Sequence, residues 1–125
     1  MDVKHMRSIL VIEDDAEMRR MLQQLLAAAG YEVRTADDGK AAGALCESKP
    51  PDLVITDIYM PNKDGLEVIM DLRASFPQVK IIAMSGQLTR KNMLPVALTL
   101  GAVRTLPKPF EIDELLQTVK EVLDG

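Results

Sequence analysis

The sequence is poor in the residues on which several common kinds of functional site depend. Its 125 residues include one cysteine, one histidine and no tryptophan, and aromatic residues make up 3%. The single cysteine, Cys46, excludes an internal disulfide. The single histidine, His5, lies outside the folded pattern, which argues against hydrolase triads and against zinc sites built from thiolates and imidazoles. Few aromatic residues and a net charge of −4 also argue against direct nucleic acid binding.

Long apolar runs are absent as well. None approaches the roughly 20 residues that span a bilayer, and the N-terminus lacks the apolar core of a signal peptide. We therefore expect no membrane insertion and a cytoplasmic location. Hydrophobic residues make up 47% and charged residues 27%, as in ordinary globular proteins. The length fits one domain, which we place at residues 7–125, with residues 1–6 disordered or left over from expression.

Short apolar runs alternate with helical patterns along the chain. Strands are expected at residues 9–12, 31–36, 53–57, 80–84 and 103–106. Helices are expected from about 18 to 29, 40 to 48, 65 to 76 (with Leu66, Ile69 and Met70 on one face), 91 to 100 and 112 to 124. This alternation predicts an α/β fold, in which helices cover both faces of a five-stranded parallel sheet.

Two prolines affect the fourth helix and the fifth strand of this pattern. Pro95 must lie in the first turn of the fourth helix or kink it. Pro107 follows the fifth apolar run, and proline within a sheet is confined to edges or strand ends. The fifth strand is therefore expected at an edge of the sheet.

Polar side chains follow four of the five predicted strands. Glu13 and Asp14 come after the first, Asp57 after the third, Ser85 after the fourth and Lys108 after the fifth. The carboxyl ends of parallel strands border the ligand crevice of such sheets, so these residues are expected to meet there. A turn-starting acid or lysine is common by itself, but the set together indicates a functional site.

Three carboxylates and one ammonium leave two negative charges in excess, which a divalent cation would balance. A small set of oxygen ligands suits Mg²⁺ better than Ca²⁺, which takes more ligands. Carboxylates, Mg²⁺, a lysine and a hydroxyl are the parts of a phosphoryl-transfer site. A carboxylate can be the nucleophile there. Asp57 stands alone on the central strand and is the candidate, while Glu13 and Asp14 are paired to hold metal.

At these positions the sequence closely resembles a bacterial two-component response regulator receiver domain, in particular the single-domain chemotaxis type. The resemblance covers about Arg7 to Leu123, and four motifs in order carry it: Ile9-Leu10-Val11-Ile12-Glu13-Asp14-Asp15, Asp57-Ile58-Tyr59-Met60-Pro61-Asn62-Lys63-Asp64-Gly65, Ser85-Gly86 and Lys108-Pro109-Phe110. It implies a flavodoxin-like three-layer sandwich with strand order 2-1-3-4-5. The edge position inferred from Pro107 agrees with that order.

The resemblance also implies roles for the site residues. Asp57 would be the phosphoacceptor, taking its phosphoryl group from a phosphohistidine on a histidine kinase or phosphotransfer protein. Asp14, Asp57 and the Tyr59 carbonyl would hold Mg²⁺, and Glu13 would reach the ion through water. Asp15 could replace one of these acids if the pair is shifted by a residue, but we assign it to capping the first helix.

On the same basis Lys108 would pair with the phosphoryl oxygens and precede a cis peptide bond to Pro109. Ser85 would turn its hydroxyl toward the phosphoryl group. The surface formed by the fourth helix, fifth strand and fifth helix would then change its conformation. That surface would bind a downstream partner or a fused output domain. Thr105 stands where many family members carry an aromatic switch residue, so coupling by an aromatic ring is not expected. As a phosphoacceptor the protein would be a signalling component rather than an enzyme, although it could catalyse its own phosphorylation and dephosphorylation.

Two rival functions remain. A haloacid-dehalogenase-like phosphatase also uses a strand-end aspartate with Mg²⁺, but that family has a second acid two residues later, where this chain has Tyr59. A degenerate receiver that acts by docking alone is the other rival. The complete set of acids, hydroxyl and lysine argues against it.

Overall fold

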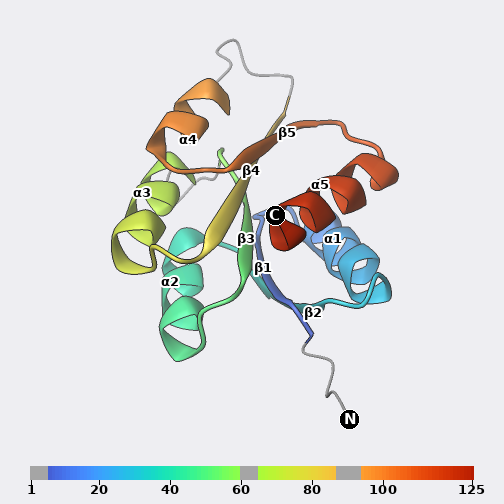
Figure 1. Cartoon of the computed structure of the whole chain (residues 1–125), viewed down its shortest axis with the longest axis horizontal. Coiled ribbons are helices and arrows are strands. Elements are labelled where there is room, and N and C mark those ends of the chain that lie inside the picture. The colour runs from blue at the N-terminus through green and yellow to red at the C-terminus, as the bar shows by residue number, and fades with distance from the viewer. Residues whose placement is uncertain (1–5, 60–64, 87–93) are drawn as a thin grey trace.

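The predicted alternation of strands and helices is present in the structure, a computed structural model that describes residues 6–59, 65–86 and 94–125 (Figure 1). The strands are β1 (Ser8–Ile12), β2 (Glu32–Ala36), β3 (Leu53–Asp57), β4 (Lys80–Gly86) and β5 (Arg104–Lys108). The helices are α1 (Ala16–Ala28), α2 (Gly39–Ser48), α3 (Gly65–Ser75), α4 (Leu94–Leu100) and α5 (Ile112–Asp124). His5, the Met60–Asp64 part of the second motif and the expected start of the fourth helix near Lys91 lie outside the described residues.

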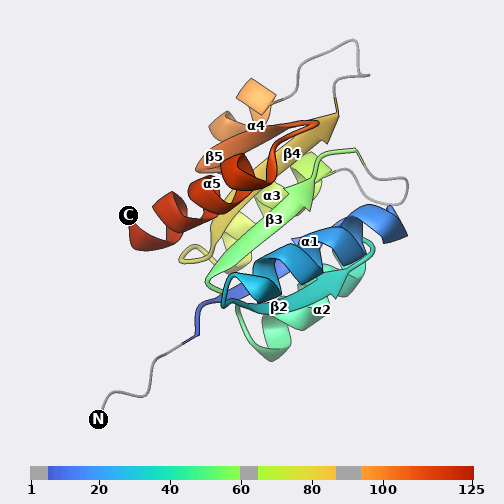
Figure 2. The same cartoon turned by 90° about the vertical axis from the view of Figure 1, so that its right-hand side faces the viewer.

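The five strands form one parallel sheet in the order β2-β1-β3-β4-β5. Helices α1 and α5 cover one face of this sheet, and α2, α3 and α4 cover the other (Figures 1 and 2). The predicted three-layer sandwich and strand order are therefore confirmed. None of the helices in the described ranges combines the length and apolarity that crossing a membrane requires.

Alternate residues of the central strands feed two separate hydrophobic cores. In β1, Ile9 and Val11 pack in the core that contains Leu22 and Leu26 of α1, whereas Leu10 and Ile12 pack in the opposite core. All five residues of β1 and of β3 are buried. Because both faces are covered, these strands carry continuous apolar sequences rather than an alternating pattern. The two central strands thus form a rigid base for the residues at their ends.

The edge position of the fifth strand is confirmed, but its boundary differs from the sequence prediction. Pro107 lies within β5, where it pairs in register with Ser85. An edge strand has a neighbour on one side, so alternate N–H groups need no partner in the sheet and proline can replace one of them. The strand therefore continues to Lys108, and β4 likewise continues through Ser85 and Gly86 instead of breaking there.

The predicted inner face of the third helix was wrong at Met70. This side chain is 52% exposed, while Val68, Ile69 and Leu72 are buried and Leu66 is partly buried. Val68 and Leu72 are four residues apart and lie on the same side of the helix, whereas Met70, between them, lies on the other side. Pro95 lies in the first turn of α4, one of the two positions that the sequence allowed.

The turn before α1 is capped as expected. The Asp15 carboxylate accepts hydrogen bonds from the amides of Glu17 (2.9 Å) and Met18 (3.4 Å). An aspartate at this position satisfies donors that the first helical turn leaves unpaired. Asp15 is thereby assigned to the helix, and the two acids before it are left for the site.

Two glycines are expected to respond in opposite ways to alanine. Gly43 lies inside α2 with no heavy atom within 4 Å of a Cβ, so Gly43→Ala should raise the free energy of unfolding by about 0.5–1 kcal/mol. At Gly65 a Cβ would overlap the carbonyl oxygen of Asp57 and Cα of Ile58. Gly65→Ala should therefore lower the free energy of unfolding by about 1–3 kcal/mol. Urea denaturation of both variants measures these changes. Equal changes in the free energy of unfolding of the two variants would contradict the prediction.

Candidate functional site

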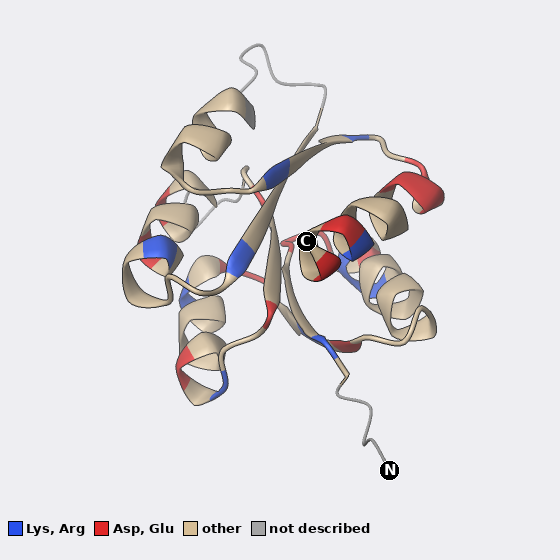
Figure 3. Ribbon diagram, in the orientation of Figure 1, with Lys and Arg blue, Asp and Glu red and all other residues tan. Residues whose placement is uncertain are grey.

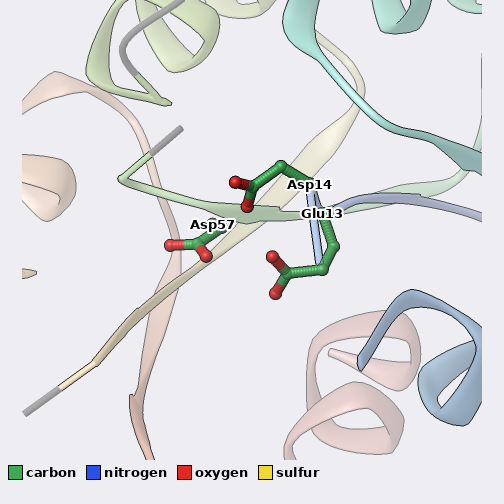
Figure 4. Close-up of side chains that lie close together, drawn as sticks. All are labelled: Glu13, Asp14 and Asp57. Carbon is green, nitrogen blue, oxygen red and sulfur yellow. The ribbon is translucent and has the colours of Figure 1, made fainter. Parts of the chain in front are cut away.

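Three carboxylates meet at the carboxyl ends of β1 and β3. Glu13 and Asp14 directly follow β1, Asp57 ends β3, and the two strands are neighbours in the sheet. Ligand oxygens of all three side chains lie within 4.8 Å of one another. Figure 4 shows the three carboxyl groups turned toward a common space. The prediction that these acids meet is confirmed.

Lys108 brings its ammonium group between two of these acids. It lies at the end of β5, and its Nζ donates to Glu13 Oε1 at 2.7 Å and to Asp57 Oδ2 at 2.9 Å. The ammonium therefore bridges residues that are 95 and 51 positions away in the sequence. Lys108 also precedes a cis peptide bond to Pro109, as expected.

Burial and neighbouring charges shift the pKa values of Glu13 and Lys108. Glu13 is 1% exposed, and its pKa is raised from 4.5 to about 7 by the balance of several effects, of which burial is the largest. Within that balance the hydrogen bond from Lys108 lowers the pKa, and the charge of Asp57 raises it. For Lys108, burial lowers the pKa, but the hydrogen bonds to Glu13 and Asp57 outweigh burial and raise it above the ordinary value.

Asp57 is held by contacts to both of its carboxylate oxygens. Oδ2 accepts from Lys108, and Oδ1 accepts from the backbone amide of Tyr59 at 3.0 Å. The chain beyond β3 is fixed where the amide of Gly65 donates to the carbonyl of Ile58 at 2.8 Å. Asp57 is therefore an oriented side chain at the end of a rigid strand, and 6% of its surface is exposed.

The donor set of this cluster fits a divalent cation. It consists of carboxylate oxygens, which hard ions such as Mg²⁺ prefer. Three carboxylates against one ammonium also leave the excess negative charge that a cation would neutralise, and the raised pKa of Glu13 is the effect expected of such crowding and burial. The Tyr59 carbonyl follows Asp57 closely in the chain, and its role as a ligand stays a prediction.

Ser85 and Thr105 lie on the last two strands. Ser85 follows Met84, the residue that pairs with Asp57 in the register of β3 and β4. Ser85 is 4% exposed, and its hydroxyl donates to the carbonyl of Gly86 at 3.4 Å, not to Asp57. Thr105 is half-buried in β5 opposite Ala83. Ser85 is thus at the expected end of the sheet, while its movement and that of Thr105 stay predictions.

One residue near the cluster was missed by sequence reasoning. Arg19 of α1 donates from Nη1 to the carbonyl of Glu13 at 2.9 Å and to that of Asp14 at 3.4 Å. The sequence offers two adjacent arginines, and which of them turns back to the loop depends on the exact start of the helix. The direct contact between Glu13 and Lys108 was missed as well.

Comparison with known proteins decides the family. The family model described as "Response regulator receiver domain" matches residues 9–120. The chain belongs to this family. Its members are signalling phosphoacceptors of two-component systems, so the coarse function inferred from the strand ends is confirmed.

Relatives of this receiver domain include transcriptional regulators. It is 38% identical over 118 residues to the DNA-binding transcriptional regulator NtrC of Azospirillum brasilense, covering 94% of this chain and 24% of that protein. It is 37% identical over 115 residues to the response regulator MprA of Mycolicibacterium vanbaalenii, covering 92% of this chain and 49% of that protein. The chain thus spans between a quarter and half the length of these relatives.

Solved structures show the same fold. NtrX from Brucella abortus, in complex with ADP, superposes with a TM-score of 0.90 at 28% identity, covering 96% of this chain and 27% of that one. The chemotaxis protein CheY4 of Vibrio cholerae superposes with a TM-score of 0.87 at 31% identity, covering 95% of this chain and all of that one. The receiver fold is therefore found both in longer regulators and in a structure of similar length.

The raised pKa of Glu13 makes the stability of the metal-free receiver domain depend on pH. A carboxyl whose pKa is higher in the folded protein stabilises the fold at pH values below its ordinary pKa, and this contribution is lost as the pH rises through the folded value. Glu13→Gln mimics the protonated side chain. We expect this variant to match wild type near pH 4.5 and to be more stable by roughly 1–3 kcal/mol above pH 7.

Urea unfolding in the presence of EDTA across this pH range measures the difference. Glu17→Gln, which removes an exposed carboxylate in the first turn of α1, is the matched control, and its difference from wild type in the free energy of unfolding should change less over this pH range than that of Glu13→Gln. If the difference in free energy of unfolding between Glu13→Gln and wild type varies with pH as little as that of the control, the pKa of Glu13 is not raised.

Proposed function

We propose that this receiver domain, residues 7–125, accepts a phosphoryl group on Asp57 from a phosphohistidine of a histidine kinase or phosphotransfer protein. An Asp57 oxygen bonds to phosphorus, the phosphorus–nitrogen bond to the donor histidine breaks, and the released imidazole takes up a proton. The position of Asp57 carries the proposal: it is an oriented carboxylate at the end of a buried central strand, beside two more acids and an ammonium. Family membership supports the same role.

Glu13, Asp14, Asp57 and the Tyr59 carbonyl are the proposed holders of Mg²⁺. The close approach of the three carboxylates supports this assignment. When bound, Mg²⁺ supplies a positive charge that stabilises the oxygens of the phosphoryl group during transfer. Asp14 is exposed on the open side of the site, and Glu13 is buried in its interior, from which it is proposed to reach the ion through water.

Lys108 is proposed to neutralise the transferred phosphoryl oxygens. Its ammonium already donates to Asp57 Oδ2, so it can contact a group attached to that carboxylate with a small movement. Lys108 would then give up part of its contact with Glu13, and a cation at the acids would replace the lost positive charge, so we expect the two to favour each other. Ser85 is proposed to donate its hydroxyl to the same group after turning away from the Gly86 carbonyl.

The proposed switch follows from the charge change. Phosphorylation turns one negative charge at Asp57 into about two and adds strong acceptor oxygens. Because Lys108 is in β5 and Ser85 in β4, attraction of both residues toward Asp57 biases the face formed by α4, β5 and α5. Thr105 lies on this face in place of an aromatic residue, so backbone and hydroxyl movement must transmit the change.

The output is proposed to be a protein interaction of this face, with a separate partner or with an output domain in a longer chain. In the relatives NtrC and MprA, the matched receiver region is about a quarter and about half of the protein. Those lengths leave room for an output domain in the same chain. Lysine and arginine positions are spread over many elements of the described structure (Figure 3). This spread over the described elements and the net charge of −4 favour a protein partner over direct contact with nucleic acid.

Incubation with Mg²⁺ and a small acyl phosphate, followed by intact mass measurement, tests the proposal. Wild type should gain the mass of one phosphoryl group in an acid-stable, base-labile adduct, and Asp57→Asn should gain none because a carboxamide is not a competent nucleophile. Asp52→Asn is the matched control at the other end of β3, where the Asp52 carboxylate accepts from the Ser8 amide at 2.8 Å. This control should be labelled like wild type.

Other outcomes separate the rival functions. A wild-type protein that binds Mg²⁺ but gains no phosphoryl group would contradict the phosphoacceptor proposal and favour a docking module. Rapid turnover of phosphate monoesters would favour a phosphatase. Labelling that persists in Asp57→Asn would place the acceptor on another residue.

A further inference from the structure

Arg19 binds the backbone of both acids that follow β1. Its Nη1 donates to the carbonyl oxygens of Glu13 at 2.9 Å and Asp14 at 3.4 Å. Arg19 is partly buried and lies in the first turn of α1, with its own amide donating to the carbonyl of Asp15 at 2.9 Å. One residue of the helix thus contacts three consecutive residues of the acidic loop.

The other contacts of this loop leave the carbonyls of the acid pair to Arg19. The Glu13 amide donates to the carbonyl of Ala36 in β2 at 3.0 Å, which fixes the start of the loop. The Asp15 amide donates to Glu13 Oε2 at 3.3 Å. The orientation of the peptide groups between Glu13 and Asp15 determines where the Glu13 and Asp14 side chains point. Among the described residues, the Arg19 guanidinium is the group that binds the carbonyl oxygens of these peptide groups.

Arg19 also changes the charge of the site without occupying the carboxylates. Within the described residues no ion pair joins its guanidinium to Glu13, Asp14 or Asp57. A cation that binds backbone oxygens offsets repulsion among nearby acids and leaves their lone pairs available to a metal ion. Lys108 differs in this respect, because it binds two of the carboxylates directly.

We infer that Arg19 is a positioning residue that sets the affinity of the acid cluster for its divalent cation. It would do so by holding the backbone of Glu13 and Asp14 in the geometry in which both side chains face Asp57. This inference rests on the proposed Mg²⁺ site. Loss of a residue that orients metal ligands typically reduces metal affinity by roughly 10- to 100-fold.

Calorimetric titration with Mg²⁺ tests the inference, and Arg20 supplies a matched control. Arg20 is the next residue of the same helix and is exposed, so its removal changes net charge equally without touching the loop. Arg19→Ala should raise the Mg²⁺ dissociation constant by about 10-fold or more. Arg20→Ala should change it less than about twofold, the scale of a screened surface charge. Arg19→Lys keeps the charge but not the planar guanidinium, so its dissociation constant should lie between wild type and Arg19→Ala.

A second readout separates positioning from simple loss of stability. With the acyl phosphate donor, Arg19→Ala should need more Mg²⁺ for half-maximal adduct formation but should reach the wild-type extent at saturating Mg²⁺. A variant that is merely less folded would instead form less adduct at every Mg²⁺ concentration. If Arg19→Ala does not fold, the comparison of Arg19→Lys with Arg20→Lys is decisive, and a weakened Mg²⁺ affinity in the first alone supports the inference.

The outcomes also distinguish this inference from the proposed function. A wild-type protein that binds no Mg²⁺ would overturn the proposed metal site and the inference with it. A wild-type protein that binds Mg²⁺ while the Arg19 and Arg20 variants have equal affinities would overturn the role of Arg19 alone.

Discussion

The bridge of Lys108 between Glu13 and Asp57 is the interaction on which the site depends. Three carboxylates crowded at the ends of two neighbouring strands repel each other, and a single ammonium at 2.7 and 2.9 Å from two of them offsets part of that repulsion. The fold makes this contact possible, because a parallel sheet brings the ends of β1, β3 and β5 to the same edge. Keeping both acids ionised in so buried a place without such a partner would cost several kcal/mol.

The same bridge connects the site to the rest of the molecule. Lys108 ends β5, which pairs with β4, and β4 in turn pairs with β3 and so with Asp57. In the proposed switch, a change of charge at Asp57 would act on the edge strand through Lys108 and on β4 through a turn of the Ser85 hydroxyl. On the opposite side, Arg19 ties the acid pair to α1. The site is thus tied to α1 through Arg19 and to β5 through Lys108, the two connections on which the proposed cation binding and the proposed response to phosphorylation rely.

The strands and the main acids could be predicted because their signals are local. The Ile9–Ile12 run followed by Glu13 and Asp14, and the Leu53–Ile55 run before Asp57, each specify a buried strand and its polar end within a few residues. Pro107 placed the fifth strand at an edge through the same kind of local chemistry. The polar residues at the strand ends then implied a shared site, since parallel strands leave little choice of where their ends meet.

The contacts that the sequence did not predict depend on helix phase and side-chain reach. Arg19 and Arg20 are indistinguishable in the sequence, and the start of α1 at Ala16 decides which of them faces the acidic loop. Met70 was assigned to the wrong side of α3 for the same reason. The contact between Glu13 and Lys108 was not predicted either, because it depends on how far two long side chains reach across the strand ends.

Hydride reduction of the phosphorylated protein tests the central claim most directly. Borohydride reduces an acyl phosphate of aspartate to the alcohol, so the modified residue becomes homoserine and can be located by peptide mass spectrometry. If Asp57 is the phosphoacceptor, protein treated with Mg²⁺ and an acyl phosphate should contain homoserine at position 57, and Asp14 should be unmodified. Homoserine at Asp14 or at any other residue would contradict it.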